Sequence, residues 1–209
     1  MKPILDIHSH FEKEVLTNTI YSFSTPNLPI DFGGYKSIGL HPWHINTSEE
    51  SWTQIEKLAQ EPLTLAIGEC GIDKKITTSI DIQQELFIKH IELSESTQKP
   101  LIIHMVGSTP EIIQLHKAIN PKQNWIIHGF RGKPELYKEY QRQGIYVSIG
   151  EKYNNCTIQL IPNQELLIET DESSKSIEQI VSKIAILRKT TPQQLIDQIY
   201  KNTTRIFFD

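Results

Sequence analysis

The alternation of short apolar runs with helical patterns constrains the fold of this 209-residue chain more than any other feature. The runs have the lengths of strands, and several are continuous blocks of apolar residues. Strands that are buried on both faces of a parallel sheet have this appearance. The eight runs lie at about residues 4–8, 19–23, 35–40, 63–68, 101–103, 125–127, 145–148 and 166–168.

Helical patterns follow most of the runs from the third onward, each with an apolar stripe at helical spacing. The first begins at a capping box formed by Thr47 and Glu50. Two others begin at a threonine followed by proline, at Thr109 and Thr191. The expected helices lie at about residues 47–59, 78–98, 109–119, 136–143, 177–184 and 191–206.

This order of elements predicts a (β/α)8 TIM-type barrel that occupies residues 1–209 as one domain. One departure is expected. About ten residues separate the first and second runs, and no helical pattern lies between the second and third, so the first two outer helices are reduced or missing. An open Rossmann-like sheet is the competing fold, and the lack of a Gly-rich phosphate loop after any strand argues against it.

Composition narrows the classes of function. The net charge is −4, and no run of Lys and Arg forms a long track for nucleic acid. The two cysteines, Cys70 and Cys156, have neither disulfide nor zinc spacing. No stretch reaches the ~18 apolar residues of a membrane span, and the start of the chain does not read as a signal peptide. We therefore expect a cytoplasmic protein with no membrane partner.

Histidines and carboxylates stand where the predicted strands end. Active sites of such barrels lie at the carboxyl ends of the strands, so these side chains are expected to meet. His8 and His10 are two apart on one strand face and can hold one divalent metal, while Asp6 can accept a hydrogen bond from a ligand histidine. The strand-end set is His8, His10, His41, Glu69, His104, His128 and Asp171.

Each of these residues alone has an ordinary structural explanation, such as a cap or a backbone contact, and the hypothesis depends on the whole set. Gly68 and Gly71 beside Glu69 indicate close approach of the backbone. Cys70 alternates away from Glu69 and is expected in the core. Three more histidines, His44, His90 and His116, are interpreted as loop or helix residues rather than ligands.

The ordered set of motifs resembles the TatD-type metal-dependent deoxyribonucleases of the amidohydrolase-like barrels. The resemblance covers nearly the whole chain. Its blocks are Asp6-Ile7-His8-Ser9-His10, Gly39-Leu40-His41-Pro42, Ile67-Gly68-Glu69-Cys70-Gly71-Ile72-Asp73, Pro100-Leu101-Ile102-Ile103-His104, Ile127-His128-Gly129-Phe130-Arg131-Gly132, Leu166-Leu167-Ile168-Glu169-Thr170-Asp171, and the closing Asn202, Arg205 and Phe207.

The resemblance implies a role for each matching residue. His8, His10 and Asp171 would hold one metal, His104 and His128 a second, and Glu69 would bridge the two. Two metals can activate a water and clamp both oxygens of an in-line displacement. The catalytic residues would be Asp171, which can also accept the water's proton, with Glu69 and His41; His41, Arg131 and Asp73 would contact substrate. The donor set suits Zn, Mn, Fe or, less well, Mg.

Two departures from the family bear on the substrate. Met105-Val106 stands where the family usually has Ser-Arg, and Arg131 either replaces that cation or is a solvated loop residue. Glu172-Ser173-Ser174 replaces a small residue, proline and an aromatic, so a wall for stacking bases is expected to be missing. The expected partner is DNA, cut from a free end; the alternative is a small phosphoester or amide substrate.

The second strand alternates aromatic and polar residues. If Tyr21 and Phe23 turn outward, they leave an apolar strip beside Leu28, Ile30 and Phe32. We expect the loop of residues 25–34 to fold over this strip, which favours a monomer; a symmetric dimer through this side is the alternative.

Overall fold

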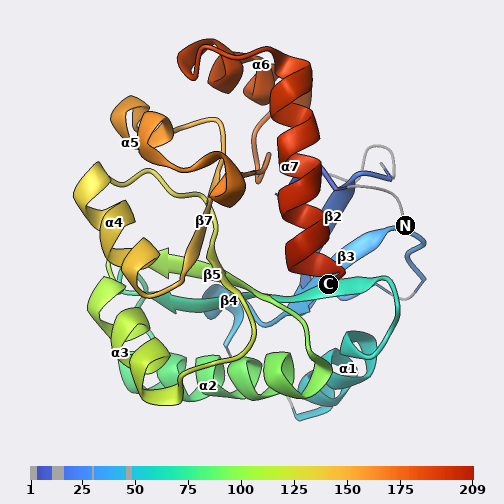
Figure 1. Cartoon of the computed structure of the whole chain (residues 1–209). Helices are drawn as coiled ribbons and strands as arrows, with labels where there is room; N and C mark the ends of the chain where they lie inside the picture. The colour runs from blue at the N-terminus through green and yellow to red at the C-terminus, as the bar shows by residue number, and fades with distance from the viewer. Residues whose placement is uncertain (1–3, 11–16, 30, 46–48) are drawn as a thin grey trace.

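Eight parallel strands follow one another around a barrel in chain order (Figure 1). The computed structural model describes residues 4–10, 17–29, 31–45 and 49–209. A bridge between Ser9 and Asp171 joins the first strand to the chain just after the last, which closes the barrel and excludes an open Rossmann-like sheet. The strands are β1 (Asp6–Ser9), β2 (Thr19–Ser24), β3 (Tyr35–Gly39), β4 (Thr64–Asp73), β5 (Leu101–Val106), β6 (Trp125–Ile127), β7 (Tyr146–Ile149) and β8 (Leu167–Ile168).

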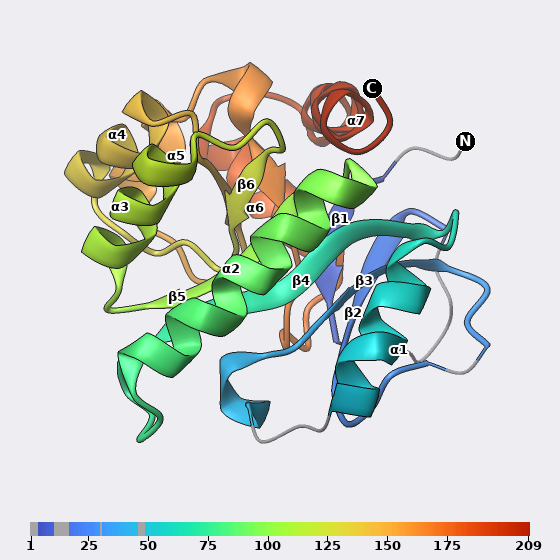
Figure 2. The ribbon, with the colours of Figure 1, turned by 90° about the horizontal axis from the view of Figure 1, so that it is seen from below.

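Helices cover the barrel from β3 onward, with α1 beside β3 and α2 lying across β4 when the molecule is seen from below (Figure 2). Ser176 and Thr191 form capping boxes with Gln179 and Gln194 and begin the last two helices. The predicted cap at Thr47 lies outside the described residues. The helices are α1 (Glu49–Ala59), α2 (Ile80–Thr97), α3 (Thr109–Ile119), α4 (Pro134–Arg142), α5 (Asn155–Leu160), α6 (Ile177–Leu187) and α7 (Pro192–Phe207), with the 3-10 turns η1 (Pro42–His44) and η2 (Asn163–Glu165).

The strands β4 and β5 run further than the sequence predicts. Glu69 and His104 were expected at strand ends, yet the ladder continues past both, to the pair formed by Asp73 and Val106. Two glycines permit this course. A Cβ on Gly68 would lie 2.3 Å from the Ile102 carbonyl oxygen and one on Gly71 2.1 Å from that of His104, and both glycines have positive φ. Close backbone approach around Glu69 is therefore confirmed.

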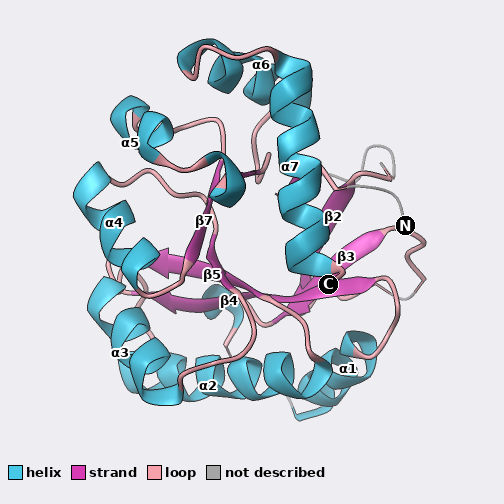
Figure 3. Ribbon diagram, in the orientation of Figure 1, coloured by secondary structure: helices cyan, strands magenta, loops and turns pink. Residues whose placement is uncertain are grey.

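Within the described residues no helix lies between β1 and β3, as predicted (Figure 3). Tyr21 and Phe23 turn outward and are nevertheless buried, because Phe32 packs against both, with ring centroids 5.3 and 4.9 Å away. The loop thus covers the strip, while Ile30 lies outside the described residues. A monomer remains a prediction.

Two residues of the closing motif, Asn202 and Arg205, hold α7 against the rest of the barrel. The side-chain amide of Asn202 donates to the carbonyls of Asn163 and Leu166, and Arg205 donates to Gln164. These bonds fasten α7 to the turn that leads into β8. They fix the approach to Glu169 and Asp171, which follow that strand.

The helix α5 is absent from the sequence prediction. It has six residues and is capped by Asn154, whose side chain accepts from the Thr157 N–H. So short a helix lacks the repeated apolar stripe that identifies longer ones. Throughout the described ranges, each helix is too short or too polar to serve as a membrane span. A cytoplasmic location remains a prediction.

Candidate metal centre

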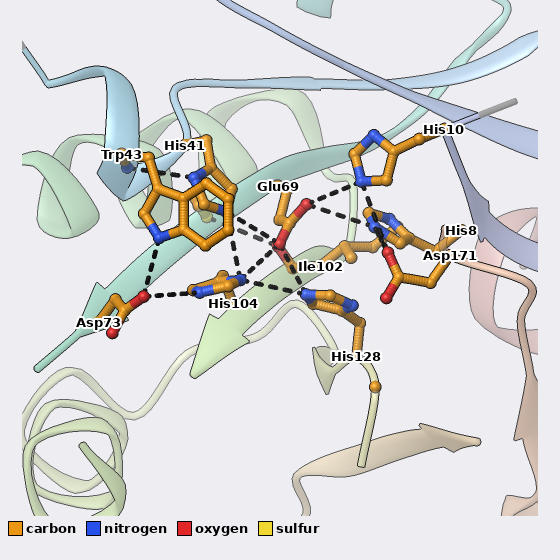
Figure 4. Close-up of polar contacts among 12 residues, drawn as sticks. His8, His10, His41, Trp43, Glu69, Asp73, Ile102, His104, His128 and Asp171 are labelled. Atoms are coloured by element: carbon orange, nitrogen blue, oxygen red, sulfur yellow. Dashed lines mark hydrogen bonds and ion pairs between the residues drawn. The ribbon is translucent and has the colours of Figure 1, made fainter. Parts of the chain in front are cut away.

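Glu69 lies at the centre of a buried cluster inside the barrel, with only 2% of its surface exposed (Figure 4). Its Oε2 is 3.3 Å from the Nε2 atoms of both His8 and His10. Its Oε1 is 2.7 Å from His104 Nδ1 and from His128 Nε2. The two carboxylate oxygens therefore face two separate groups of nitrogen donors, which is the arrangement of a bridging ligand.

Asp171 joins the group on the Oε2 side through the closure of the barrel. Its backbone N–H donates to the His8 carbonyl at 2.8 Å, and the His10 N–H donates to the Asp171 carbonyl at 3.2 Å. Its Oδ1 then lies 3.8 and 3.7 Å from the Nε2 atoms of His8 and His10. The structure thus brings together the three residues predicted for one metal.

His8 provides a test of whether these donors fit a metal. Its ring is fully buried, and neither ring nitrogen makes a hydrogen bond to the described residues, although Nε2 lies 3.3 Å from Glu69 Oε2. A buried nitrogen without a partner costs free energy, and a metal ion would satisfy it. Imidazole and carboxylate donors also suit several divalent metals. The cluster therefore fits such an ion.

Asp6 has different partners from those expected. Its carboxylate accepts from the backbone N–H and hydroxyl of Thr170 and from the backbone N–H of His8, and among the described residues it bonds to no histidine ring. Burial raises its pKa to about 7, against these hydrogen bonds. Asp6 in β1 therefore bonds to Thr170, which follows β8, and holds the two segments together.

Carboxylates also stand behind the second group of histidines. Asp73 Oδ2 lies 3.4 Å from His104 Nε2, and Glu69 Oε1 lies 2.7 Å from His104 Nδ1, so each ring nitrogen of His104 faces a carboxylate. Glu169 Oε1 lies 3.6 Å from His128 Nδ1. Carboxylates behind ligand histidines are common at metal sites, where they fix the ring orientation.

The role of Glu169 was not predicted from the sequence. It is fully buried and accepts hydrogen bonds from the Gly129 N–H and the Ser148 hydroxyl. Its position two residues before Asp171 was a usable signal, because alternate residues of an extended segment share a face.

His41 lies against the same cluster, but its hydrogen bonds point to another role. Its Nδ1 accepts from the Trp43 N–H at 3.1 Å, and burial lowers its pKa, so the neutral ring carries its proton on Nε2. That Nε2 is 3.2 Å from Glu69 Oε1. A nitrogen that carries a proton cannot ligate a metal, so this arrangement favours His41 as a hydrogen-bond donor near the cluster.

The charges of the cluster support one another. Burial alone would raise the pKa of Glu69, but His128 and the other facing histidines hold it well below its usual range. Burial alone would lower the pKa of His128, but the carboxylates of Glu69 and Glu169 raise it well above the usual value. For His8, burial and the nearby His128 lower the pKa. A central carboxylate that stays ionised is available to a cation.

A cavity of about 640 Å³ opens above the cluster. Of the predicted substrate contacts, His41 and Arg131 line it, and Asp73 does not. Arg131 is exposed and has no hydrogen-bond or ion-pair partner within the described part of the chain. Val106, which stands where the resemblance to the family leads us to expect arginine, lines the same cavity. Asp73 instead has both carboxylate oxygens bonded to protein groups, which favours a positioning role.

The residues interpreted as structural have the expected surroundings. Cys70 is buried, and His116 packs edge-on against Trp125. His90 accepts from the Leu40 N–H at 2.9 Å through Nε2 and contacts the Leu86 carbonyl through Nδ1. His44 lies in η1, as a loop or helix residue, and also lines the cavity.

The family model described as TatD related DNase matches residues 29–208 of this chain. The chain belongs to this family. The uncharacterised metal-dependent hydrolase YabD of Bacillus subtilis is 29% identical in an alignment of 196 residues that covers 83% of this chain and 77% of that protein. The 3′-5′ ssDNA/RNA exonuclease TatD of Cronobacter turicensis is 27% identical over 150 residues, which cover 66% of this chain and 57% of that protein.

Solved structures of TatD homologues share the barrel. The YJJV protein of Escherichia coli K12 superposes with a TM-score of 0.79 at 17% identity, covering 98% of this chain and 96% of that one. The TatD family protein of Entamoeba histolytica gives 0.80 at 14% identity, covering 99% and 98%. These matches confirm the predicted fold, and the match to the family model confirms the predicted family. The chain is a metal-dependent hydrolase of the TatD family.

Proposed function

We propose that this hydrolase cleaves phosphodiester bonds at the 3′ end of single-stranded DNA with two divalent metal ions. The observation that carries the proposal is the central position of Glu69, whose two oxygens face two donor groups. His8, His10 and Asp171 would hold one ion, His104 and His128 the other, and Glu69 would bridge them. Paired divalent metals supply an activated water and stabilise the charge on the phosphoryl oxygens.

The chain's own residues would then orient the substrate and move protons. Asp171, with about a quarter of its side chain exposed, would accept the proton of the attacking water at a carboxylate oxygen. His41 would donate its Nε2–H to a phosphate oxygen, since its Nδ1 is already engaged by Trp43. Arg131, free of protein partners in the described residues, would meet a phosphate at the rim of the cavity.

A free strand end suits this site better than a long duplex. The cavity has the size of sites for small ligands, and the chain has no basic track beyond it. The relatives named as 3′-5′ exonucleases support the direction of cleavage.

The test is incubation with single-stranded DNA labelled at either end, with Mg, Mn, Co or Zn. We expect metal-dependent shortening from the 3′ end, seen as a ladder with the 5′ label and immediate release of the 3′ label. If none of these metals supports cleavage, the proposed nuclease activity is excluded.

A second candidate is hydrolysis of a small phosphoester. The observation in its favour is the apolar pair Met105 and Val106 on the cavity wall, where a phosphate-binding cation is usual in the family. A panel of small phosphoesters and amides separates the two. If these are turned over and DNA is not, the second candidate holds.

A further inference from the structure

Trp43 is exposed at the mouth of the metal centre. Its surface is 60% exposed, and it is the only aromatic residue among the large hydrophobic side chains that the described part of the chain leaves exposed. Its ring centroid lies 4.8 Å from that of His41 and 5.8 Å from that of His104. Because the indole is mostly exposed, burial of apolar surface does not account for its position.

The indole is held in one orientation. Its Nε1–H donates to Asp73 Oδ2 at 2.8 Å (Figure 4). Asp73 Oδ1 accepts from the Lys75 N–H at the same distance. Gln83 fixes the backbone of Asp73 by accepting its N–H at 2.8 Å and donating to its carbonyl at 3.1 Å. The hydrogen bond uses the edge of the indole. The planar face is left for a ligand. Because the Trp43 side chain is already held in place, little of its conformational entropy would be lost when a ligand binds.

The cavity that Trp43 lines carries both apolar and charged side chains. Met105 and Val106 line the cavity together with Trp43, and Val106 pairs with Asp73, the residue that holds the indole. Arg131 lines the same cavity. A nucleotide has both kinds of group that such a lining can contact, a planar base for Trp43 and an anionic phosphate for the histidines and Arg131.

We propose that Trp43 stacks on the nucleobase of the nucleotide whose phosphate enters the metal centre. The substrate would then be a strand end that carries a base, rather than any small phosphoester. Stacking on an aromatic ring accepts every base, since each has a π face. Recognition would be independent of sequence. For the cleaved substrate this inference rests on the proposed nuclease function.

A binding experiment tests the stacking separately from the chemistry. Deoxyadenosine 5′-monophosphate and deoxyribose 5-phosphate share the sugar and phosphate and differ by the base. By calorimetry we expect the metal-loaded protein to bind the nucleotide about 5- to 100-fold more tightly. Trp43→Ala should remove this preference and Trp43→Phe should keep part of it. Trp52→Phe, which alters an indole of α1 bonded to Glu56, is the matched control and should change nothing.

A cleavage experiment links the stacking to the reaction. Oligonucleotides that end in a normal or an abasic 3′ nucleotide are compared by kcat/KM. The wild type should prefer the normal end by about 5- to 100-fold, and Trp43→Ala should cut both ends at similar rates. An equal preference in the wild type and Trp43→Ala would overturn the stacking role.

The two experiments separate this inference from the proposed function. A wild type that cuts no strand, yet binds the nucleotide selectively through Trp43, would overturn the nuclease and support base recognition. A wild type that cuts strands but ignores the base would overturn the inference and leave the nuclease in place.

Discussion

The buried cluster and the rim of the cavity are built in different ways. Glu69 and His104 lie within strands, and Asp171 is fixed by main-chain bonds to β1. At the rim, Trp43 lies in a 3-10 turn and Arg131 in a loop. Cluster residues have partners on several sides, whereas Arg131 has none within the described ranges.

This difference indicates which residues of the site can be substituted without disturbing the barrel. Replacing a cluster residue disturbs partners on neighbouring strands. Replacing a rim residue alters a loop while the barrel keeps its geometry. One metal centre can therefore serve different substrates through different rims. The comparison predicts that cluster variants lose metal and rim variants lose substrate affinity.

The largest effect is expected for Glu69→Gln. The change keeps the shape and removes the charge that both donor groups face, so binding of at least one metal should weaken. We expect a loss of activity of about 1,000-fold or more, because metals supply several kcal/mol of stabilisation to the transition state. Metal analysis and activity measure this, and circular dichroism should show an intact fold.

Glu92→Gln makes the same chemical change on an exposed face of α2 and serves as the control. It should retain metal and activity. A Glu69→Gln protein that is fully active would contradict the assignment of Glu69 as the bridge.

Asp73→Asn tests the boundary between the cluster and the rim, since Asp73 contacts both His104 and Trp43. The amide has one acceptor oxygen where the carboxylate has two, so the orientation of His104 should loosen. We expect about 10- to 100-fold weaker metal binding or activity, as for other carboxylates behind ligand histidines. Titration of metal into the apo protein measures it. If metal binding is unchanged and only KM rises, Asp73 belongs to the rim.

Much of the cluster was predictable from the sequence, because strand ends of a parallel barrel meet at one face. That rule alone predicts that His8, His10 and His128 meet in one cluster. It misjudged how far β4 and β5 extend, because Gly68 and Gly71 look like strand ends in a sequence. In the structure these glycines allow backbone contacts that no side chain would permit.

Partners across the barrel were harder to predict. Asp6 contacts Thr170, 164 residues away, which periodicity within one strand cannot reveal. Trp43 gave no signal, because one tryptophan in a loop has no spacing to interpret. Its position depends on the hydrogen bond to Asp73, a contact between two separate blocks of sequence.

The smallest effect is expected at the rim, for Arg131→Ala. A hydrogen bond from a charged group is worth about 1.5–3 kcal/mol, and solvent exposure of Arg131 places it at the lower end. We therefore expect KM for single-stranded DNA to rise about 10-fold, with kcat and metal content unchanged. Lys133→Ala removes a nearby positive charge outside the cavity lining and should have little effect. Adding Val106→Arg to the Arg131→Ala protein places a cation at the family's usual position on the same cavity wall. Recovery of KM in this double variant would show that Arg131 replaces the missing arginine, whereas an unchanged KM in Arg131→Ala would make it a solvated loop residue.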